Sequence, residues 1–196
     1  MTATLSAAPQ RVAPRDPRPV PPRTPFGRIA RVELRKMFDT RAGLWLMISI
    51  GVLAVLATGA VILWAPDEEI NLGSFSGAMG MPLAILLPMV AILSVTSEYS
   101  QRSGLTTYTL VPWRGRVILA KLLVTVAIGV VSMFMALAVG VVGNLLGSAI
   151  VGIDPVWDLS STQFANIVLA QVLGMLIGFT LGILIRNSPA AIVGYF

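Results

Sequence analysis

Four long apolar stretches constrain this chain more than any other feature of its sequence. They occupy residues 42–64, 74–97, 117–147 and 160–185, and no ionisable side chain occurs from Ile70 to Ser97 or from Leu122 to Ile153. The first stretch has 23 residues, which span about 34 Å as a helix, and a bilayer's hydrocarbon core is about 30 Å thick. The pattern predicts an all-α fold, a polytopic transmembrane helical bundle with four full spans.

Composition supports the membrane class and excludes several kinds of chemistry. Charged residues make up only 12% of the 196 residues, and the mean hydropathy is +0.84, well above that of soluble domains. The chain has no cysteine and no histidine, which excludes disulfides, thiolate nucleophiles, histidine-ligated metals and imidazole acid–base chemistry. The basic residues stand at the ends of apolar stretches rather than in an aromatic-interleaved patch, so we expect no nucleic-acid partner.

Two segments precede the first span. Residues 1–25 contain seven prolines and four arginines, a composition that predicts a disordered cytoplasmic tail. Residues 26–41 predict an amphipathic interfacial helix, although a merely basic flank to the first span is the alternative. The apolar side of this helix contains Phe26, Ile29, Ala30, Leu34, Met37 and Phe38. The charged side contains Arg28, Arg31, Arg35 and Asp39. Val32 and Glu33 break the pattern.

The last ten residues, 187–196, become apolar again. Ten helical residues reach about half-way across a bilayer. We therefore expect the transmembrane domain, residues 42–196, to end in the start of a fifth span, and the functional chain to continue beyond Phe196.

The distribution of basic residues predicts the orientation in the membrane. Lys and Arg occur before the first span, between the second and third spans, and after the fourth, whereas the connections 65–70 and 153–158 contain acidic residues and no Lys or Arg. By the positive-inside rule, the N-terminus, the 98–116 loop and Arg186 are cytoplasmic. The sequence thus predicts a multi-pass protein of the plasma membrane, the inner membrane in a bacterium.

The uncharged spans contain no obvious source of energy or catalysis. Proton and ion carriers keep ionisable groups within the membrane, and a phosphate-binding loop needs a Gly-Lys-Ser/Thr sequence. Neither lysine of the chain, Lys36 or Lys121, follows a glycine, and Asp67, Asp154 and Asp158 lie in the outer connections. We predict no catalytic residue, cofactor site or metal site in this chain, and energy that comes from another protein.

Small and polar residues form stripes on the third and fourth spans. Ala170, Gly174, Gly178 and Gly182 repeat every four residues, with Gln163 and Gln171 on the same side. Such stripes let helices approach closely. They predict either packing within the bundle, a seam between subunits or a substrate path. The side chains that we consider for the path are those of Asn144, Gln163, Asn166 and Gln171.

Two prolines, Pro82 and Pro88, lie inside the second span. Each removes a backbone hydrogen bond, which predicts a bend. The bend is either a static kink or a hinge for motion between the cytoplasmic end and the membrane interior.

The 98–116 loop is the most polar part of the second half of the chain. From Ser103, a plausible N-cap, Leu105, Tyr108 and Val111 recur at three-residue spacing until Pro112, which predicts a short amphipathic helix. This helix would rest on lipid headgroups or fit a groove on a cytoplasmic partner.

The sequence EYSQRSGLTTYTLVPWRGRVILAKLL, which begins at Glu98, resembles the first cytoplasmic loop of ABC transporter permeases of the type-2 (exporter) family. The resemblance extends to the layout of residues 26–196, but the family has six spans. It implies a coupling helix that docks on a separate ATP-binding subunit carrying ATP and Mg, and a second permease subunit in a homo- or heterodimer. The docking residues that it implies are Glu98, Gln101, Arg102, Ser103, Gly104, Leu105, Thr106, Thr107 and Tyr108.

These observations together predict a permease subunit that exports an amphipathic or lipid-like substrate and is powered by a docked ATPase. The alternative is a membrane scaffold or accessory subunit that recruits a cytoplasmic partner without transport. A passive channel is disfavoured, because the sequence contains no ring of charge and no filter motif.

Overall fold

The computed structural model describes residues 24–39, 41–100 and 114–196. Residues 1–23 of the predicted tail and most of the 98–116 loop lie outside these residues. The described residues form an all-α bundle, as predicted. Its elements are α1 (Phe26–Asp39), α2 (Arg41–Trp64), the short 3-10 helix η1 (Asp67–Glu69), α3 (Leu72–Ser100), α5 (Arg114–Val151), α6 (Ser161–Ile185) and α7 (Ser188–Tyr195).

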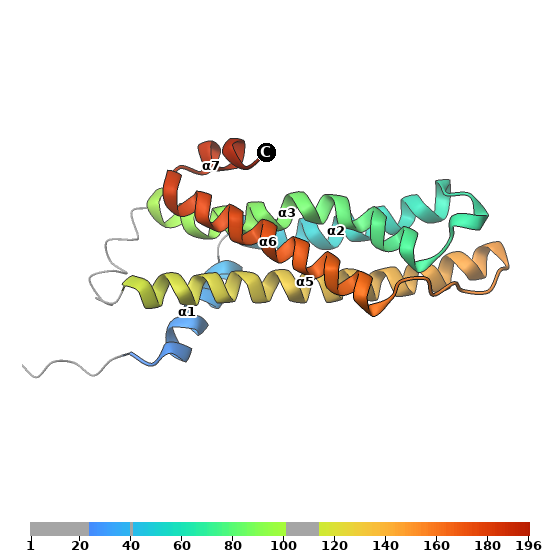
Figure 1. The fold of residues 1–196 in the computed structure, drawn as a ribbon, viewed down its shortest axis with the longest axis horizontal. Helices are drawn as coiled ribbons and strands as arrows, with labels where there is room; N and C mark the ends of the chain where they lie inside the picture. Colours follow the sequence, from blue (N-terminus) through green and yellow to red (C-terminus); the bar gives the residue numbers. More distant parts are fainter. Residues whose placement is uncertain (1–23, 40, 101–113) are drawn as a thin grey trace, which may run out of the picture.

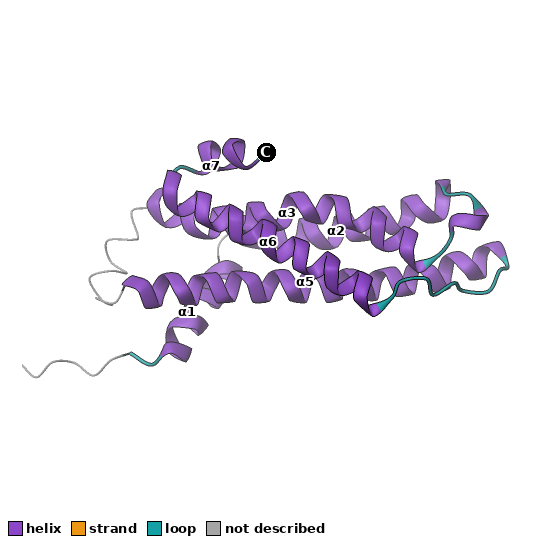
Figure 2. Cartoon of the chain, in the orientation of Figure 1, coloured by secondary structure: helices purple, strands orange, loops and turns teal. Residues whose placement is uncertain are grey.

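The four longest helices, α2, α3, α5 and α6, lie lengthwise beside one another (Figures 1 and 2). Their apolar parts have 22, 28, 37 and 25 residues, and each is longer than the roughly 20 residues that cross a bilayer. The prediction of four spans in a multi-pass membrane protein is confirmed. The helix bounds differ from the predicted spans mainly for α5, which extends beyond 117–147 at both ends.

The two ends of the bundle differ in charge. Helix α1 and the ends of α3 and α5 that flank residues 101–113 lie at one end, which we call the basic end (Figure 1). The connections 65–71 and 152–160 lie at the other, which we call the acidic end. The ends alternate along the chain as the distribution of basic residues predicts.

Helix α3 lies at the centre of the bundle, in contact with α2, α5 and α6. Its side chains Phe75, Leu87, Ala91 and Ile92 are fully buried. Helix α2 instead exposes most of its apolar side chains, from Leu44 to Trp64. Lipid or another subunit therefore has to cover α2, because an apolar surface of this size is not stable in water.

The glycines of α6 form its contact with α3. A Cβ atom at Gly178 would lie 2.9 Å from the carbonyl oxygen of Pro88, and one at Gly182 would lie 3.2 Å from that of Ile92. Because these neighbours are backbone atoms, they cannot move aside as a flexible side chain can. The glycine stripe is thus a packing seam within the bundle, and Ala170 lies outside this seam, on the exposed side of α6.

Helix α7 turns back along the bundle after α6 ends (Figure 1). Arg186 adopts a left-handed backbone conformation with φ 57°, and the Asn187 side chain accepts a hydrogen bond from the backbone of Ala190. Helix α7 contacts both α6 and α3, and Ser188 Oγ donates to Thr96 Oγ1 over 2.7 Å. The segment predicted as the start of a fifth span is an eight-residue helix, about 12 Å long.

Candidate functional site

Four charged side chains from three helices meet at the basic end. Glu33 and Lys36 come from α1, Glu98 from the last turn of α3 and Lys121 from α5, about two turns after its start. Lys36 Nζ lies 2.8 Å from Glu33 Oε1 and 3.0 Å from Glu98 Oε1. Lys121 Nζ contacts Glu33 Oε2 and lies 3.2 Å from Glu98 Oε1. We call these four residues the charge cluster.

The charge cluster is balanced and mostly shielded from solvent. The side chains of Glu33, Lys121 and Glu98 are 3%, 9% and 11% exposed, and only that of Lys36 reaches 40%. A buried charge is costly unless an opposite charge compensates it, and here two carboxylates face two ammonium groups. Separating α1 from α3 and α5 would break the Lys36–Glu98 and Lys121–Glu33 pairs and leave one pair within α1 and one between α3 and α5, so two of the four contacts fix α1 to the bundle.

The pKa values of α1 follow from this arrangement. Burial alone raises the pKa of Glu33, but the attraction and hydrogen bond of Lys121, reinforced by Lys36, hold the pKa below its ordinary value of 4.5. Burial alone lowers the pKa of Lys36, but hydrogen bonds to Glu33 and Glu98 raise the pKa above its ordinary 10.5. Both shifts favour the charged forms, which are the forms that hold the cluster together.

Helix α1 packs part of its predicted apolar side, together with Glu33, against the bundle. Ile29 packs against Val117 and Ala120 of α5, and Glu33 is buried on the same side. Leu34 and Phe38, which belong to the predicted apolar side, are 42% and 48% exposed. The charge on Lys121 turns Glu33 inward, and the side of α1 with Leu34 and Phe38 is left uncovered by the bundle.

Only one of the predicted ATPase-docking residues is described. Glu98 belongs to the charge cluster, so its carboxylate points toward α1 and α5 rather than toward solvent. Gln101, Arg102, Ser103, Gly104, Leu105, Thr106, Thr107 and Tyr108 lie outside the described residues.

The connections of the acidic end are bound to each other and to the helices. The Val156 carbonyl accepts hydrogen bonds from Leu72 N over 3.1 Å and from Asn144 Nδ2 over 3.0 Å. Asp158 Oδ1 accepts from Gly73 N over 2.7 Å. These bonds fix the 152–160 connection over the start of α3, so the position of Asp158 is well defined.

An open pocket of about 350 Å³ lies beneath that connection, between α3 and α6. Its polar rim carries the Asp158 carboxylate and the amides of Gln163 and Asn166. Gln163 is engaged locally, because its Oε1 accepts from Ser160 N in the capping box of α6. Ser76 lies deeper in the pocket, and its Oγ is buried without a hydrogen-bond partner among the described residues.

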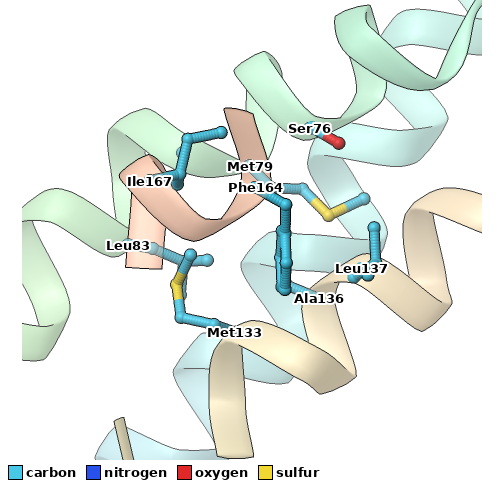
Figure 3. A pocket seen from close by; sticks show the side chains of 9 residues that line it. Ser76, Met79, Leu83, Met133, Ala136, Leu137, Phe164 and Ile167 are labelled. Atoms are coloured by element: carbon cyan, nitrogen blue, oxygen red, sulfur yellow. The ribbon is translucent and has the colours of Figure 1, made fainter. Parts of the chain in front are cut away.

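A second, apolar gap adjoins the pocket, since Ser76 and Ile167 line both. The gap has a volume of about 20 Å³, enough for about one water molecule. Figure 3 shows its lining: Phe164 reaches from α6 toward Ala136 of α5, with the sulfur-bearing side chains of Met79 and Met133 beside it. The open pocket and the apolar gap are thus neighbours that share two lining residues.

The side chains predicted for a substrate path separate into two groups. Gln163 and Asn166 line the pocket. Asn144 instead holds Val156, and Gln171 Nε2 donates to the Gly80 carbonyl of α3 over 3.4 Å. Ser76 and Asp158 line the pocket but were not among the predicted path residues. A serine one turn into a span and an acidic residue just before the next span are the signals that could have indicated them.

Comparison of the chain with family models, curated proteins and solved structures finds no match. The charge cluster and the pocket therefore have to be interpreted from their own geometry. Among the described residues, no three His, Cys, Asp or Glu side chains are grouped so that they could hold a metal ion.

Proposed function

We propose that this chain is a membrane-spanning permease subunit of an ATP-driven ABC transporter of the type-2 (exporter) family. A separate ATPase would dock on the loop between α3 and α5, and the substrate would be amphipathic or lipid-like. The chain would lie in the plasma membrane with its basic end in the cytoplasm. The observation that carries the proposal is the charge cluster, because it joins α1 to the two helices that flank this loop.

The cluster gives a force on the loop a route into the bundle. Glu98 lies two residues before the end of α3, and Lys121 lies in the first turns of α5. A displacement of the loop therefore acts on both helices at a point where they are ionically joined, and α1 follows through Glu33. Helix α3 then extends to the acidic end, where Gly73 and Ser76 line the pocket. ATP and Mg would be bound by the docked subunit.

The proposal includes a second permease subunit. The uncovered apolar face of α2 is long enough to form a subunit contact, and lipid would cover the rest. The alternative function remains a scaffold or accessory subunit, in which the same loop recruits a partner but no substrate moves.

Deletion of Ser103–Thr107 tests the docking step. The deletion leaves Glu98 and Lys121 in place, so we expect the bundle to insert while co-purification with the ATPase is lost. The partner for this experiment would be a Walker-type ATPase encoded by an adjacent reading frame and co-expressed with the chain; an adjacent gene of this kind would itself favour the transporter. As a matched control, replacement of Asp67, Glu68 and Glu69 at the acidic end by their amides should leave co-purification intact. Unchanged recovery of the ATPase with the deletion variant would refute the proposal.

A second measurement separates a transporter from a scaffold. In liposomes that contain the assembled complex, a transported amphiphile should change the rate of ATP hydrolysis. A scaffold has no reason to respond, so an ATPase rate that no amphiphile alters would favour the alternative.

A further inference from the structure

We propose that the pocket between α3 and α6 is a binding site for a single-chain cationic amphiphile, such as an alkylamine. Its ammonium group would pair with Asp158, and its alkyl chain would enter the gap between Met79, Met133 and Phe164. Binding by itself requires no ATPase. That the ligand is also the transported substrate rests on the proposed function.

The charge of the acidic end selects a cation. Residues 65–71 and 152–160 contain five carboxylates, those of Asp67, Glu68, Glu69, Asp154 and Asp158, and no Lys or Arg. All ion pairs of the described residues lie at the basic end. Asp158 is exposed and has no ion pair among the described residues, so it is free to pair with a mobile cation, which the sum of the five charges attracts.

The geometry fixes where the cation would bind. Gly73 N holds Asp158 Oδ1 over 2.7 Å, so the carboxylate is oriented before any ligand arrives. An ammonium group there would find a further acceptor in the Asn166 side chain, which lines the same pocket. Ser76 also lines the pocket, but its Oγ is buried, so an ammonium group could reach it only after neighbouring side chains move.

The lining and the size of the cavity select a single alkyl chain. The neighbouring gap is lined mostly by apolar side chains, including the flexible thioethers of Met79 and Met133, which adapt to varied ligand shapes. The gap of about 20 Å³ has to widen by movement of these side chains to admit a chain. The outer pocket of about 350 Å³ is near the lower limit of small-molecule sites, so a two-chain lipid does not fit.

Photo-crosslinking in nanodiscs of zwitterionic lipid tests the site. The probe is a ten-carbon alkylamine with a diazirine in its chain, and the matched probe is the alcohol of the same length. We expect the amine to label the segments that contain Met79, Met133 or Phe164 more than the lipid-facing residues of α2, which serve as the internal reference. Equal labelling of the pocket by amine and alcohol would overturn the assignment of a cation and indicate ordinary lipid contact.

Two pairs of variants make the test specific. Asp158→Asn keeps an oxygen for Gly73 N but removes the charge, and should lower pocket labelling about five-fold, as for an exposed ion pair. Asp154→Asn removes one negative charge from the same connection and should change pocket labelling little. Gly77→Leu should fill the pocket, because a Cβ at Gly77 meets no atom within 4 Å, and Gly51→Leu on α2, where the space is equally open, is its control.

Equal effects of the two aspartate variants would refute the role of Asp158, and full labelling of Gly77→Leu would refute the pocket itself. If Gly77→Leu does not insert, the aspartate pair still decides. Because the assay contains no ATPase, loss of ATPase docking would leave its result unchanged, and failure of the labelling would leave the docking experiment unaffected.

Discussion

Replacement of Lys121 by methionine tests the view that the charge cluster fixes α1 to the bundle. Methionine keeps the length and apolar stem of the side chain but removes the ammonium group. Glu33 and Glu98, whose side chains are 3% and 11% exposed, would then share only Lys36. Since the Lys36 side chain is 40% exposed, water weakens its pairing with both carboxylates.

The magnitude follows from the burial of the remaining charges. Removal of one partner from a buried ion pair costs about 3–5 kcal/mol, because the other charge stays buried without compensation. Lys36 still compensates in part, so we take the lower value of about 3 kcal/mol. The population in which α1 is detached should therefore rise on the order of a hundred-fold. Replacement of Arg35 by methionine breaks an ion pair whose side chains are 82% and 64% exposed, and should cost less than about 1 kcal/mol.

Hydrogen exchange of the α1 amides measures this detachment directly. We expect a large loss of protection in α1 for Lys121→Met and a small one for Arg35→Met. Adding Glu33→Gln to Lys121→Met removes one charge of each sign and leaves Lys36 with Glu98, 3.0 Å apart, so most of the protection should return. Equal protection of α1 in Lys121→Met and Arg35→Met would contradict the reasoning. A double variant that loses as much protection as the sum of its two single changes would also contradict it.

Two further predictions concern pH and the packing of α6. The lowered pKa of Glu33 stabilises the bundle above pH 4.5, and this stability is lost as the pH falls through the lowered pKa. The raised pKa of Lys36 stabilises the bundle below pH 10.5, and this stability is lost as the pH rises through the raised pKa. Spin labels on cysteines introduced at Arg31 and Leu119, in a chain without native cysteine, should therefore keep a constant separation between about pH 4.5 and 10.5 and move apart outside it, and Glu33→Gln should weaken the acid transition. Gly178→Ala places a Cβ 2.9 Å from the Pro88 carbonyl oxygen and should cost about 1–3 kcal/mol of unfolding free energy in detergent. Gly51→Ala, whose Cβ meets no atom within 4 Å, should not destabilise the bundle. Equal effects of the two variants would contradict the packing seam between α6 and α3.

The membrane bundle could be predicted from the sequence because span length and apolarity are properties of consecutive residues. Ser161–Ile185 begins within one residue of its predicted start, since Ser160 and Gln163 form a capping box visible in the sequence. The charge cluster could not be predicted in the same way. Glu33 interrupts the apolar side of its own helix, and the partner that explains it, Lys121, is 88 residues away.

The candidate path could be predicted only in part. A polar side chain in an apolar helix either bonds to another helix or lines a pocket, and sequence spacing does not distinguish these two roles. Asn144 and Gln171 bond to carbonyl groups across the bundle, whereas Asn166 lines an open pocket. The pocket also depends on Asp158, which reaches it because the 152–160 connection folds over the start of α3. That fold is set by hydrogen bonds between segments far apart in the chain.

The contacts of α3 restrict how the bundle can move. Pro88 removes a hydrogen bond to the Ala84 carbonyl, which by itself would favour a hinge, but Gly178 of α6 lies directly against the Pro88 backbone. A bend of α3 toward α6 would push the two backbones into one another, and we therefore expect α3 and α6 to move together. The charge cluster joins α5 to α3 at the basic end, and farther along the helices Met133 of α5 faces the apolar gap. Movement of α5 against the α3–α6 pair would therefore change the width of the gap, where the inferred ligand chain would bind.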